Sequence, residues 1–219
     1  MMTSPKTIAG GLFISFEGPE GAGKSTQVNL LKTHLEKQGY PVLVTREPGG
    51  TPLGEELRVL AKHMDGEEAP VPVAELLIMG ASRAQHAAKV ITPYLATGGI
   101  VICDRFADST TVYQGIGRDL DMDFVQRLHK ITTAGCWPAV TIVLDVPPEI
   151  GLARSRSRDY GEGVKDRFEE ESLDFHTKVR NGFLALAKRE PARFRVFSTE
   201  LPKENVHAGI VAAVDKLLP

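Results

Sequence analysis

A glycine-rich segment near the start of the sequence, FEGPEGAGKSTQ at residues 16–27, has residue types and a spacing suited to holding phosphate groups. It matches the pattern G-x-x-x-x-G-K-[ST], in which glycines let consecutive backbone N–H groups turn toward an oxyanion. In this pattern Lys24 reaches the β- and γ-phosphates of a nucleoside triphosphate, and Ser25 is a ligand of Mg²⁺. The residues expected around the triphosphate are Gly18, Pro19, Glu20, Gly21, Ala22, Gly23, Lys24, Ser25 and Thr26.

The elements that must position this loop are predicted on either side of it. The apolar run GLFISF at 11–16 is typical of a buried strand, and STQVNLLKTHLEKQG at 25–39 has apolar residues at helical spacing and ends at a glycine. A strand, a glycine loop and a helix therefore follow one another in the order that a phosphate site requires. The alternative is a tight glycine turn without a ligand.

Four further apolar runs are separated by sequence of helical period. This alternation predicts an α/β fold with a parallel five-stranded sheet flanked by helices, in a single domain over residues 1–219. Ligands of such sheets bind at the carboxyl ends of the strands, so the residues after each strand are the candidates for chemistry. The four runs are PVLVT at 41–45, GIVICD at 99–104, AVTIVLDV at 139–146 and RFRVFST at 193–199.

Charged side chains follow the second and third strands. In TREPGGTPLGEELR we expect Arg46 to fork onto phosphate oxygens, while Glu47 orients Arg46 or contacts a sugar hydroxyl. An ordinary surface ion pair is the alternative. DRFADSTTVYQGIGR begins with Asp104, which would hold an Mg²⁺-bound water or brace Arg105.

Polar side chains in two other places could recognise a base. Ser109, Thr110 and Gln114 have the hydroxyl and amide groups that bind base edges, although such residues also fill ordinary loops. Arg83 lies in the middle of one long predicted helix at 73–98, where most arginines are solvated. Neither observation by itself identifies a base.

An arginine-rich segment follows the fourth strand. Arg154, Arg156 and Arg158 occupy alternate positions ahead of a stretch with two glycines. Such a segment, about 154–167, suits a lid that closes over phosphates and excludes water. A solvated basic helix end is the alternative.

The number of arginines bears on the reaction. Arg46, Arg105 and the group at 154–158 exceed what one cradled triphosphate with Mg²⁺ requires, which indicates a second polyanion. A phosphate monoester has a second pKa of about 6, so an acceptor phosphate is already deprotonated at pH 7 and needs no general base. We therefore expect phosphoryl transfer to an acceptor phosphate, with its charge balanced by Lys24, Mg²⁺ and arginines.

The composition of the whole chain limits its partners. The 219 residues carry a net charge of −2, so there is no global basic field for nucleic acid or an anionic membrane. The sequence has no signal-peptide pattern and no membrane-length apolar run. Cys103 and Cys136 are too far apart for a C-x-x-C metal pattern and are expected to be reduced. We expect a cytoplasmic protein that binds small nucleotides.

Six segments, in this order and spacing, resemble the thymidylate kinase family, whose members pass the γ-phosphate of ATP to dTMP. The resemblance extends from Leu12 to about Phe183. It implies a P-loop kinase fold, a homodimer, and ATP, dTMP and Mg²⁺ as ligands. The segments are FEGPEGAGKST, TREPGGTPLGEELR, SRAQH, DRFADSTTVYQG, LDVPPEIGLARSRSR and DRFEEES.

The resemblance also implies roles for single residues. Glu20 would face the acceptor sugar, Arg83 would bind a thymine carbonyl, and Tyr113 would crowd the 2′ side of the sugar. The arginines of the lid would touch the donor phosphates, as in the bacterial subclass of the family. The implied dTMP contacts are Glu20, Arg46, Glu47, Met79, Arg83, Arg105, Thr110, Tyr113 and Gln114; the expected catalytic residues are Lys24, Arg105, Arg154, Arg156 and Arg158; and the expected metal ligands are Ser25 and Asp104.

Three positions depart from the family pattern. Met79 and Gly80 stand where many relatives have an aromatic residue that can stack on the base. Because a thioether can also cover a ring face, we expect contact with the base but looser base selection. The stretch 158–166 is longer than is common, and Ala139 stands where an aspartate is common.

Three other functions remain as alternatives. A GTPase-type switch would have N-K-x-D and D-x-x-G motifs, which this sequence lacks. A motor or helicase fragment would have a basic stripe. A related kinase acting on another nucleotide or on a deoxynucleoside is the third alternative: the segments DRFADST and SRAQH favour dTMP, but the departures from the family pattern concern base recognition.

Overall fold

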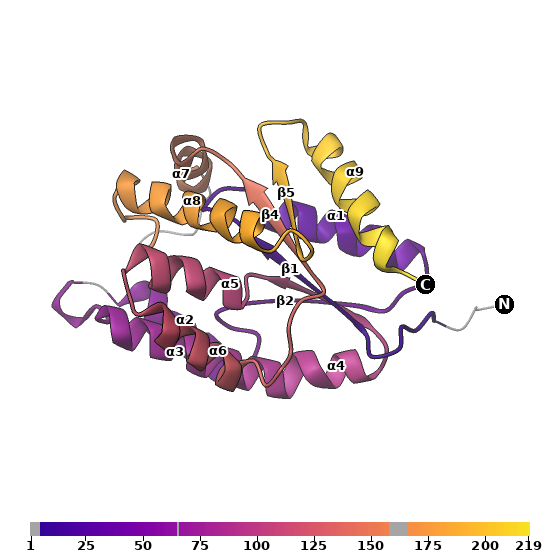
Figure 1. Ribbon diagram of the computed structural model, residues 1–219, viewed down its shortest axis with the longest axis horizontal. Helices are drawn as coiled ribbons and strands as arrows, with labels where there is room; N and C mark the ends of the chain where they lie inside the picture. Colours follow the sequence, from indigo (N-terminus) through magenta and orange to yellow (C-terminus); the bar gives the residue numbers. More distant parts are fainter. Residues whose placement is uncertain (1–4, 65, 158–165) are drawn as a thin grey trace.

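The computed structural model describes residues 5–64, 66–157 and 166–219, and these contain a parallel sheet of five strands. The strands lie in the order β2-β3-β1-β4-β5, and every neighbouring pair is parallel (Figure 1). The predicted α/β fold is confirmed, and each strand overlaps its predicted run. The strands are β1 (Leu12–Glu17), β2 (Val42–Arg46), β3 (Ile100–Asp104), β4 (Val140–Asp145) and β5 (Phe194–Ser198).

Helices cover both faces of this sheet (Figure 1). On one face, Leu31 of α1 (Lys24–Lys37) and Ile210 of α9 (Lys203–Val214) pack with Ile14 and Phe16 of β1. On the opposite face, the sheet packs against α8 (Leu173–Arg189), α4 (Thr92–Ala96), α5 (Ala107–Thr110) and the wider turns η2 (Ala87–Ile91) and η3 (Thr111–Gly117), with α3 (Pro72–His86) beside them. The remaining helical elements are α2 (Pro52–His63), which packs on α3, α6 (Met122–Thr132), α7 (Pro148–Arg156), η1 (Gly66–Glu68) and η4 (Asp215–Leu217), which follows α9.

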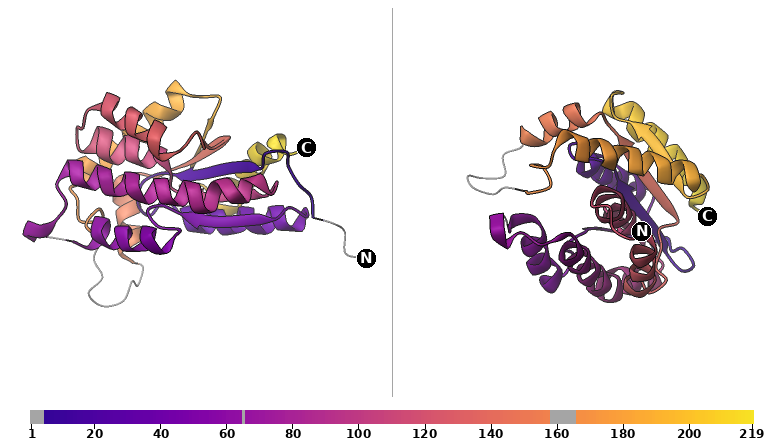
Figure 2. Two further views of the ribbon diagram at one scale, coloured as in Figure 1. Left: turned by 90° about the horizontal axis from the view of Figure 1, so that it is seen from below. Right: turned by 60° about the vertical axis from the view of Figure 1, so that its left-hand side comes forward.

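The long helix predicted at 73–98 is present, but its middle is wound more widely. Figure 2 shows α3, η2 and α4 as one continuous rod along the sheet. In η2 the Thr92 N–H donates to the carbonyl of Ala87, five residues earlier. Pro93 explains this local π-type turn, because a proline lacks an N–H group and its ring clashes with the carbonyl four residues before it.

The strand register brings the predicted functional segments to one edge of the sheet. Phe16 of β1 and Arg46 of β2 both pair with Asp104 of β3. The glycine loop after β1 is therefore flanked by the residues that follow β2 and β3. In open parallel sheets this edge is where ligands bind.

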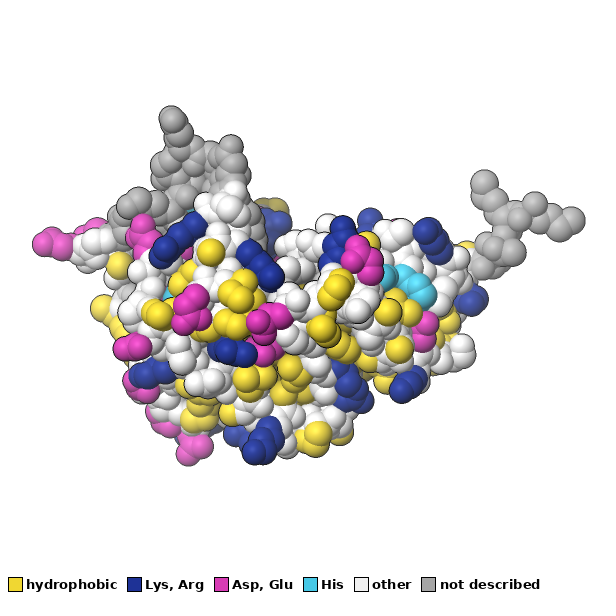
Figure 3. Space-filling model, turned by 90° about the horizontal axis from the view of Figure 1, so that it is seen from above, with side chains coloured by type: hydrophobic (Ala, Val, Ile, Leu, Met, Phe, Trp, Pro, Cys, Tyr) yellow, Lys and Arg dark blue, Asp and Glu magenta, His cyan; other side chains and the backbone are white. Residues whose placement is uncertain are grey.

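The surface shows no dominant charge on the face drawn in Figure 3. Lys and Arg side chains there alternate with Asp, Glu and hydrophobic side chains. Within the described residues, every helix is too short or too polar to cross a membrane.

Candidate active site

The glycine loop joins β1 to α1 and lies close to β4 and α7. Gly18, Gly21 and Gly23 have φ angles of 135°, 66° and 85°, in the region that favours glycine. A Cβ on Gly18 would lie 2.3 Å from the carbonyl oxygen of Leu144, and one on Gly21 would lie 1.8 Å from that of Gly151. The loop therefore requires glycine both for its turn and for its packing.

Lys24 is the first residue of α1 and lies inside the loop. Its Nζ donates to the carbonyl oxygens of Gly18 at 3.2 Å and Pro19 at 3.0 Å. Burial, assisted by the positive charge of Arg105, lowers the pKa of Lys24 to about 8. No side chain caps the first turn of α1, so its N–H groups can serve an anion.

The two side chains predicted as metal ligands lie next to this loop. Ser25 Oγ donates to Asp104 Oδ2 at 3.3 Å, which joins the start of α1 to the end of β3. The pair matches the predicted metal ligands, and a hydroxyl and a carboxylate are the oxygens that Mg²⁺ prefers. In the part of the chain that the structure describes, no group of three or more His, Cys, Asp or Glu side chains could hold a metal ion.

Arg105 follows β3 with a φ of 69°, which is unusual for a residue with a side chain. Its Nη1 donates to the Gly18 carbonyl at 3.0 Å and to Ser109 Oγ at 3.2 Å. Its Nη2 donates to Glu20 Oε1 at 2.8 Å. Arg105 is thus held by three acceptors, of which Gly18 and Glu20 belong to the glycine loop and Ser109 to α5.

Glu20 receives a second hydrogen bond, from the hydroxyl of Tyr113 at 3.0 Å. Burial by itself would raise the pKa of Glu20, but the charges of Arg105 and Lys24 hold that pKa well below its usual value. The Glu20 carboxylate therefore remains ionised and orients both Arg105 and Tyr113.

A polar cavity of about 570 Å³ lies over the glycine loop. Arg46 faces it from the end of β2 and is half exposed, with its Nη2 2.8 Å from Glu55 Oε2. Most of the residues that line this cavity are charged, as a site for polyanions requires. The lining residues include Glu20, Gly21, Gly23, Lys24, Ser25, Thr26, Arg46, Glu47, Arg58, Lys62, Asp104, Arg105 and Asp166.

A narrower and more apolar pocket adjoins the first. Five of the predicted dTMP contacts, which come from α3, α5 and η3, line this pocket and not the charged cavity. The two cavities have Glu20, Glu47, Lys62 and Arg105 in common. The lining residues of the narrow pocket include Met79, Arg83, Thr110, Tyr113, Gln114, Pro48, Phe106, Ser109 and Phe168.

Arg83 lines this pocket and is almost fully buried. Its Nε donates to Glu47 Oε2 at 2.9 Å, and its Nη2 donates to the Phe106 carbonyl at 3.2 Å and to Thr110 Oγ1 at 2.9 Å. Its Nη1 is buried without a hydrogen-bond partner among the described residues. A buried guanidinium N–H without a partner is costly, so this atom fits a carbonyl oxygen supplied by a ligand.

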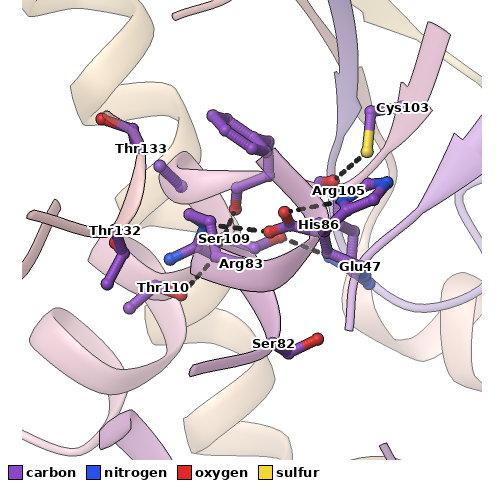
Figure 4. Close-up of polar contacts among 12 residues, drawn as sticks. Glu47, Ser82, Arg83, His86, Cys103, Arg105, Ser109, Thr110, Thr132 and Thr133 are labelled. Atoms are coloured by element: carbon purple, nitrogen blue, oxygen red, sulfur yellow. Dashed lines mark hydrogen bonds and ion pairs between the residues drawn. The ribbon is translucent and has the colours of Figure 1, made fainter. Parts of the chain in front are cut away.

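The expectation that Glu47 orients Arg46 is wrong. Glu47 turns inward, where its two oxygens accept from Arg83 and from His86 Nδ1 at 3.0 Å, while Arg46 pairs with Glu55 (Figure 4). Adjacent residues of an extended strand point to opposite faces, which separates Glu47 from Arg46. Glu47 still lines both cavities, so its predicted contact with the acceptor stays a prediction.

The predicted lid lies only in part within the described residues. Arg154 reaches the loop after β5, with its Nη2 3.3 Å from the Thr199 carbonyl. Arg154 and Arg156 are both exposed, and neither lines the two cavities. Arg158 lies outside the described residues. The role of these arginines therefore stays a prediction.

The end of the predicted lid is attached to α2. Lys62 Nζ pairs with Asp166 Oδ2, the Arg167 N–H donates to the Lys62 carbonyl at 3.0 Å, and Arg167 Nε donates to the Ala61 carbonyl at 2.6 Å. Lys62 and Asp166 both line the charged cavity, so this end of the predicted lid lies beside it.

Sequence reasoning missed several residues of the site. Arg58 and Lys62, one turn apart on α2, line the charged cavity, and their spacing on one helix face was the available signal. Phe168 of the segment after the lid packs edge-on against Tyr113, with ring centroids 5.8 Å apart. Glu75, which is fully buried behind the narrow pocket, had no local signal.

Comparisons with known proteins agree with these features. A family model described as thymidylate kinase matches residues 16–210. A thymidylate kinase of Synechococcus sp. (strain JA-2-3B'a(2-13)) is 47% identical over 208 residues, covering 95% of this chain and 96% of the relative. One of Thermomicrobium roseum is 48% identical over 206 residues, covering 94% and 95%. The crystal structure of thymidylate kinase from Ehrlichia chaffeensis superimposes with a TM-score of 0.74 at 33% identity, covering 93% of this chain and 98% of that chain.

Proposed function

This chain belongs to the thymidylate kinase family, and on that premise we propose that it is a dTMP kinase, which transfers the γ-phosphoryl group of ATP to the phosphate of dTMP and releases ADP and dTDP. The observation that carries the proposal is the pair of joined cavities. One is charged and lies over the glycine loop, the other is narrow and largely apolar, and Arg105 lies in the walls of both. Such an arrangement suits two nucleotides whose phosphates meet.

The donor side is assigned to the glycine loop. Lys24, the N–H groups at the start of α1 and Thr26 would bind the phosphates of ATP. The Lys24 contacts with two loop carbonyls support this assignment, because the bound phosphates can replace those acceptors. Residues 1–219 would act as a single domain, with the segment 154–167 as its lid.

The acceptor side is assigned to the narrow pocket. Arg83 Nη1, which is buried without a partner among the described residues, supports the proposed contact with a thymine carbonyl. Thr110, Met79 and Gln114 would complete the contacts with the base, and Tyr113 lies beside Glu20 where the sugar would fit. Arg46 and Arg105 would bind the 5′-phosphate from two sides.

Catalysis in this site is a matter of position and charge. An oxygen of the dTMP phosphate attacks the γ-phosphorus as the bond to the bridging oxygen of ADP breaks, and no general base is needed. Lys24 and Arg105 would stabilise the charge that spreads over the moving group. Arg154, Arg156 and Arg158 would add positive charge and exclude water when the lid closes.

Mg²⁺ is the metal that the residues present fit best. The Ser25 hydroxyl and the Asp104 carboxylate, 3.3 Å apart, would hold it, directly or through water, beside the phosphates. When bound, it would neutralise charge on the β- and γ-phosphates.

A homodimer is supported by an apolar surface on α2, α3 and α6, which lie side by side (Figure 1). Leu53 and Leu60 of α2 are 50% and 43% exposed, Leu77 of α3 is 48% exposed, and Ile131 of α6 is 76% exposed. Exposed apolar side chains gathered on neighbouring helices are typical of a protein–protein interface. A second copy of this chain is the partner we propose.

The cytoplasm is the proposed location. Small nucleotides are the proposed ligands, and neither cysteine is in a disulfide, as expected in a reducing compartment. The net charge of −2 supports the view that nucleic acid and anionic membranes are not partners. Family membership favours none of the three alternatives: the switch, the motor and a kinase with another base preference.

The test is ADP release from Mg-ATP with dTMP, dUMP, dCMP, dGMP, AMP or no acceptor. We expect release with dTMP to exceed the others, to fall about 10²–10³-fold in Lys24→Ala, and to stay unchanged in Lys32→Ala, which removes an exposed lysine of the same helix. Equal release with several pyrimidine monophosphates would contradict the thymine assignment. Release only without acceptor would favour a nucleotide switch.

A further inference from the structure

Glu75 is a fully buried carboxylate that lies behind the narrow pocket and does not line it. It comes from α3, the helix that also carries Arg83. We propose that Glu75 is a positioning residue that fixes the direction of the Gln114 amide, and that this makes the pocket select thymine over cytosine. The inference rests on the proposed function, because it concerns how the acceptor base is recognised.

The contact between these two side chains determines which end of the amide faces the ligand. Gln114 Nε2 donates to Glu75 Oε1 at 2.6 Å, and Gln114 is itself buried in the wall of the pocket. A carboxylate only accepts hydrogen bonds, so the amide can pair with it only through its NH₂ group. The carbonyl oxygen of Gln114 is then the end left for the base.

Two arginines hold Glu75 in the orientation that this contact requires. Arg118 donates to both oxygens of Glu75, from Nη2 to Oε2 at 3.2 Å and from Nε to Oε1 at 3.4 Å, and Arg167 Nη2 donates to Oε2. Arg118 is held in turn by Glu171, at 2.6 Å. Because two guanidinium groups fix the plane of the carboxylate, its Oε1 stays within reach of the Gln114 amide.

The wall of the resulting pocket contains both a donor and an acceptor. The donor is Arg83 Nη1, which has no partner among the described residues, and the acceptor is the Gln114 carbonyl oxygen. Thymine presents the complementary pair, the acceptor O4 next to the donor N3–H. Cytosine presents the reverse, a donor amino group next to the acceptor N3, and would leave buried polar groups unpaired at both positions.

Glu75→Gln tests this role. A glutamine at position 75 can accept from Nε2 of Gln114 or donate to its carbonyl, so both directions of the amide become possible. We expect kcat/KM for dTMP to fall about tenfold, and the ratio of kcat/KM for dTMP to that for dCMP to fall at least as much. The matched control is Glu190→Gln, which makes the same change at an acidic partner of Arg193, outside this network, and should keep the wild-type ratio.

Thermal melting would reveal whether Glu75→Gln folds. If it does not fold, two further measurements still test the role of Glu75. Glu75→Asp retains an acceptor-only side chain and should keep the wild-type ratio, even if KM rises. The wild-type enzyme should bind dTMP methylated at N3 at least about tenfold more weakly than dTMP, since the methyl group removes the donor.

The outcomes separate this inference from the proposed function. A wild-type enzyme that phosphorylates none of the nucleotides would overturn both. A wild-type preference for dTMP that persists unchanged in Glu75→Gln would overturn only the role of Glu75. Equal binding of dTMP and its N3-methyl form would show that no acceptor faces N3 and would also overturn it.

Discussion

Arg105 and Glu20 form an ion pair at the junction of the two cavities, with Arg105 Nη2 2.8 Å from Glu20 Oε1. Both side chains are largely buried, at 14% and 16% exposure. The pair sets the guanidinium between the glycine loop and the narrow pocket, at the place where two phosphate groups would meet. Its geometry should therefore matter more for the reaction than for the fold.

Arg105→Lys is expected to lower kcat/KM for dTMP about 10²-fold, because a lysine cannot bind Glu20, Gly18 and Ser109 in the same planar arrangement. Steady-state kinetics with dTMP as the varied substrate measure the effect. Arg195→Lys is the control, since the acceptors of Arg195 among the described residues are the nearby backbone carbonyls of Pro191, Ala192 and Phe194. Wild-type kinetics in Arg105→Lys would contradict a role in catalysis.

Glu17 is expected to make stability depend on pH. Burial and the charge of Asp108 raise the pKa of Glu17 to about 7 despite the opposing charge of Arg105. Because this pKa exceeds the unfolded value, the group's favourable contribution is fully present below about pH 4.5 and is lost as the pH rises through 7. Glu17→Gln keeps the shape of the side chain but cannot ionise. The free energy of unfolding of this variant, relative to that of the wild type, should therefore be higher at pH 8 than at pH 4.5, by up to about 3 kcal/mol.

Urea unfolding of wild type and Glu17→Gln at the two pH values measures this difference. Glu17 also accepts hydrogen bonds from the Phe106 N–H and the Ser109 hydroxyl, and the substitution changes these bonds at both pH values. Comparing the two pH values for each protein cancels any effect of these bonds that does not depend on pH. An equal stability difference at both pH values would contradict the raised pKa.

Met79→Ala is expected to weaken dTMP binding about two- to tenfold, because the thioether lines the narrow pocket and can cover one face of the base. Calorimetric titration with dTMP and separately with ATP measures both affinities. The ATP affinity should stay unchanged, since Met79 does not line the charged cavity. An unchanged dTMP affinity would argue against any contact with the base.

Leu77→Glu is expected to convert the proposed homodimer into a monomer, because it places a charge in the apolar surface of α2, α3 and α6. Sedimentation velocity measures the mass. Leu201→Glu, at an equally exposed leucine in the loop before α9, should leave the mass unchanged. A wild-type protein that sediments as a monomer at every concentration would rule out this dimer.

The succession of strands and helices along the chain and the identity of the phosphate loop were evident from the sequence, because both depend on local sequence pattern. Apolar runs and helical periods predicted all five strands and the helix after the loop. The residues that line the two cavities were also predicted in good part, since the carboxyl ends of parallel strands meet at one edge of a sheet.

Only the tertiary structure decided which side chains pair with one another. Glu47 was expected beside its sequence neighbour Arg46, but it binds Arg83, 36 residues away. Glu75 meets Gln114, Arg118 and Arg167, which are 39, 43 and 92 residues away. A sequence pattern records spacing along the chain, whereas these contacts depend on how helices from different parts of the chain pack behind the sheet edge. The chemistry of this protein was therefore readable from its sequence, and the orientation of the groups that would select its acceptor base was not.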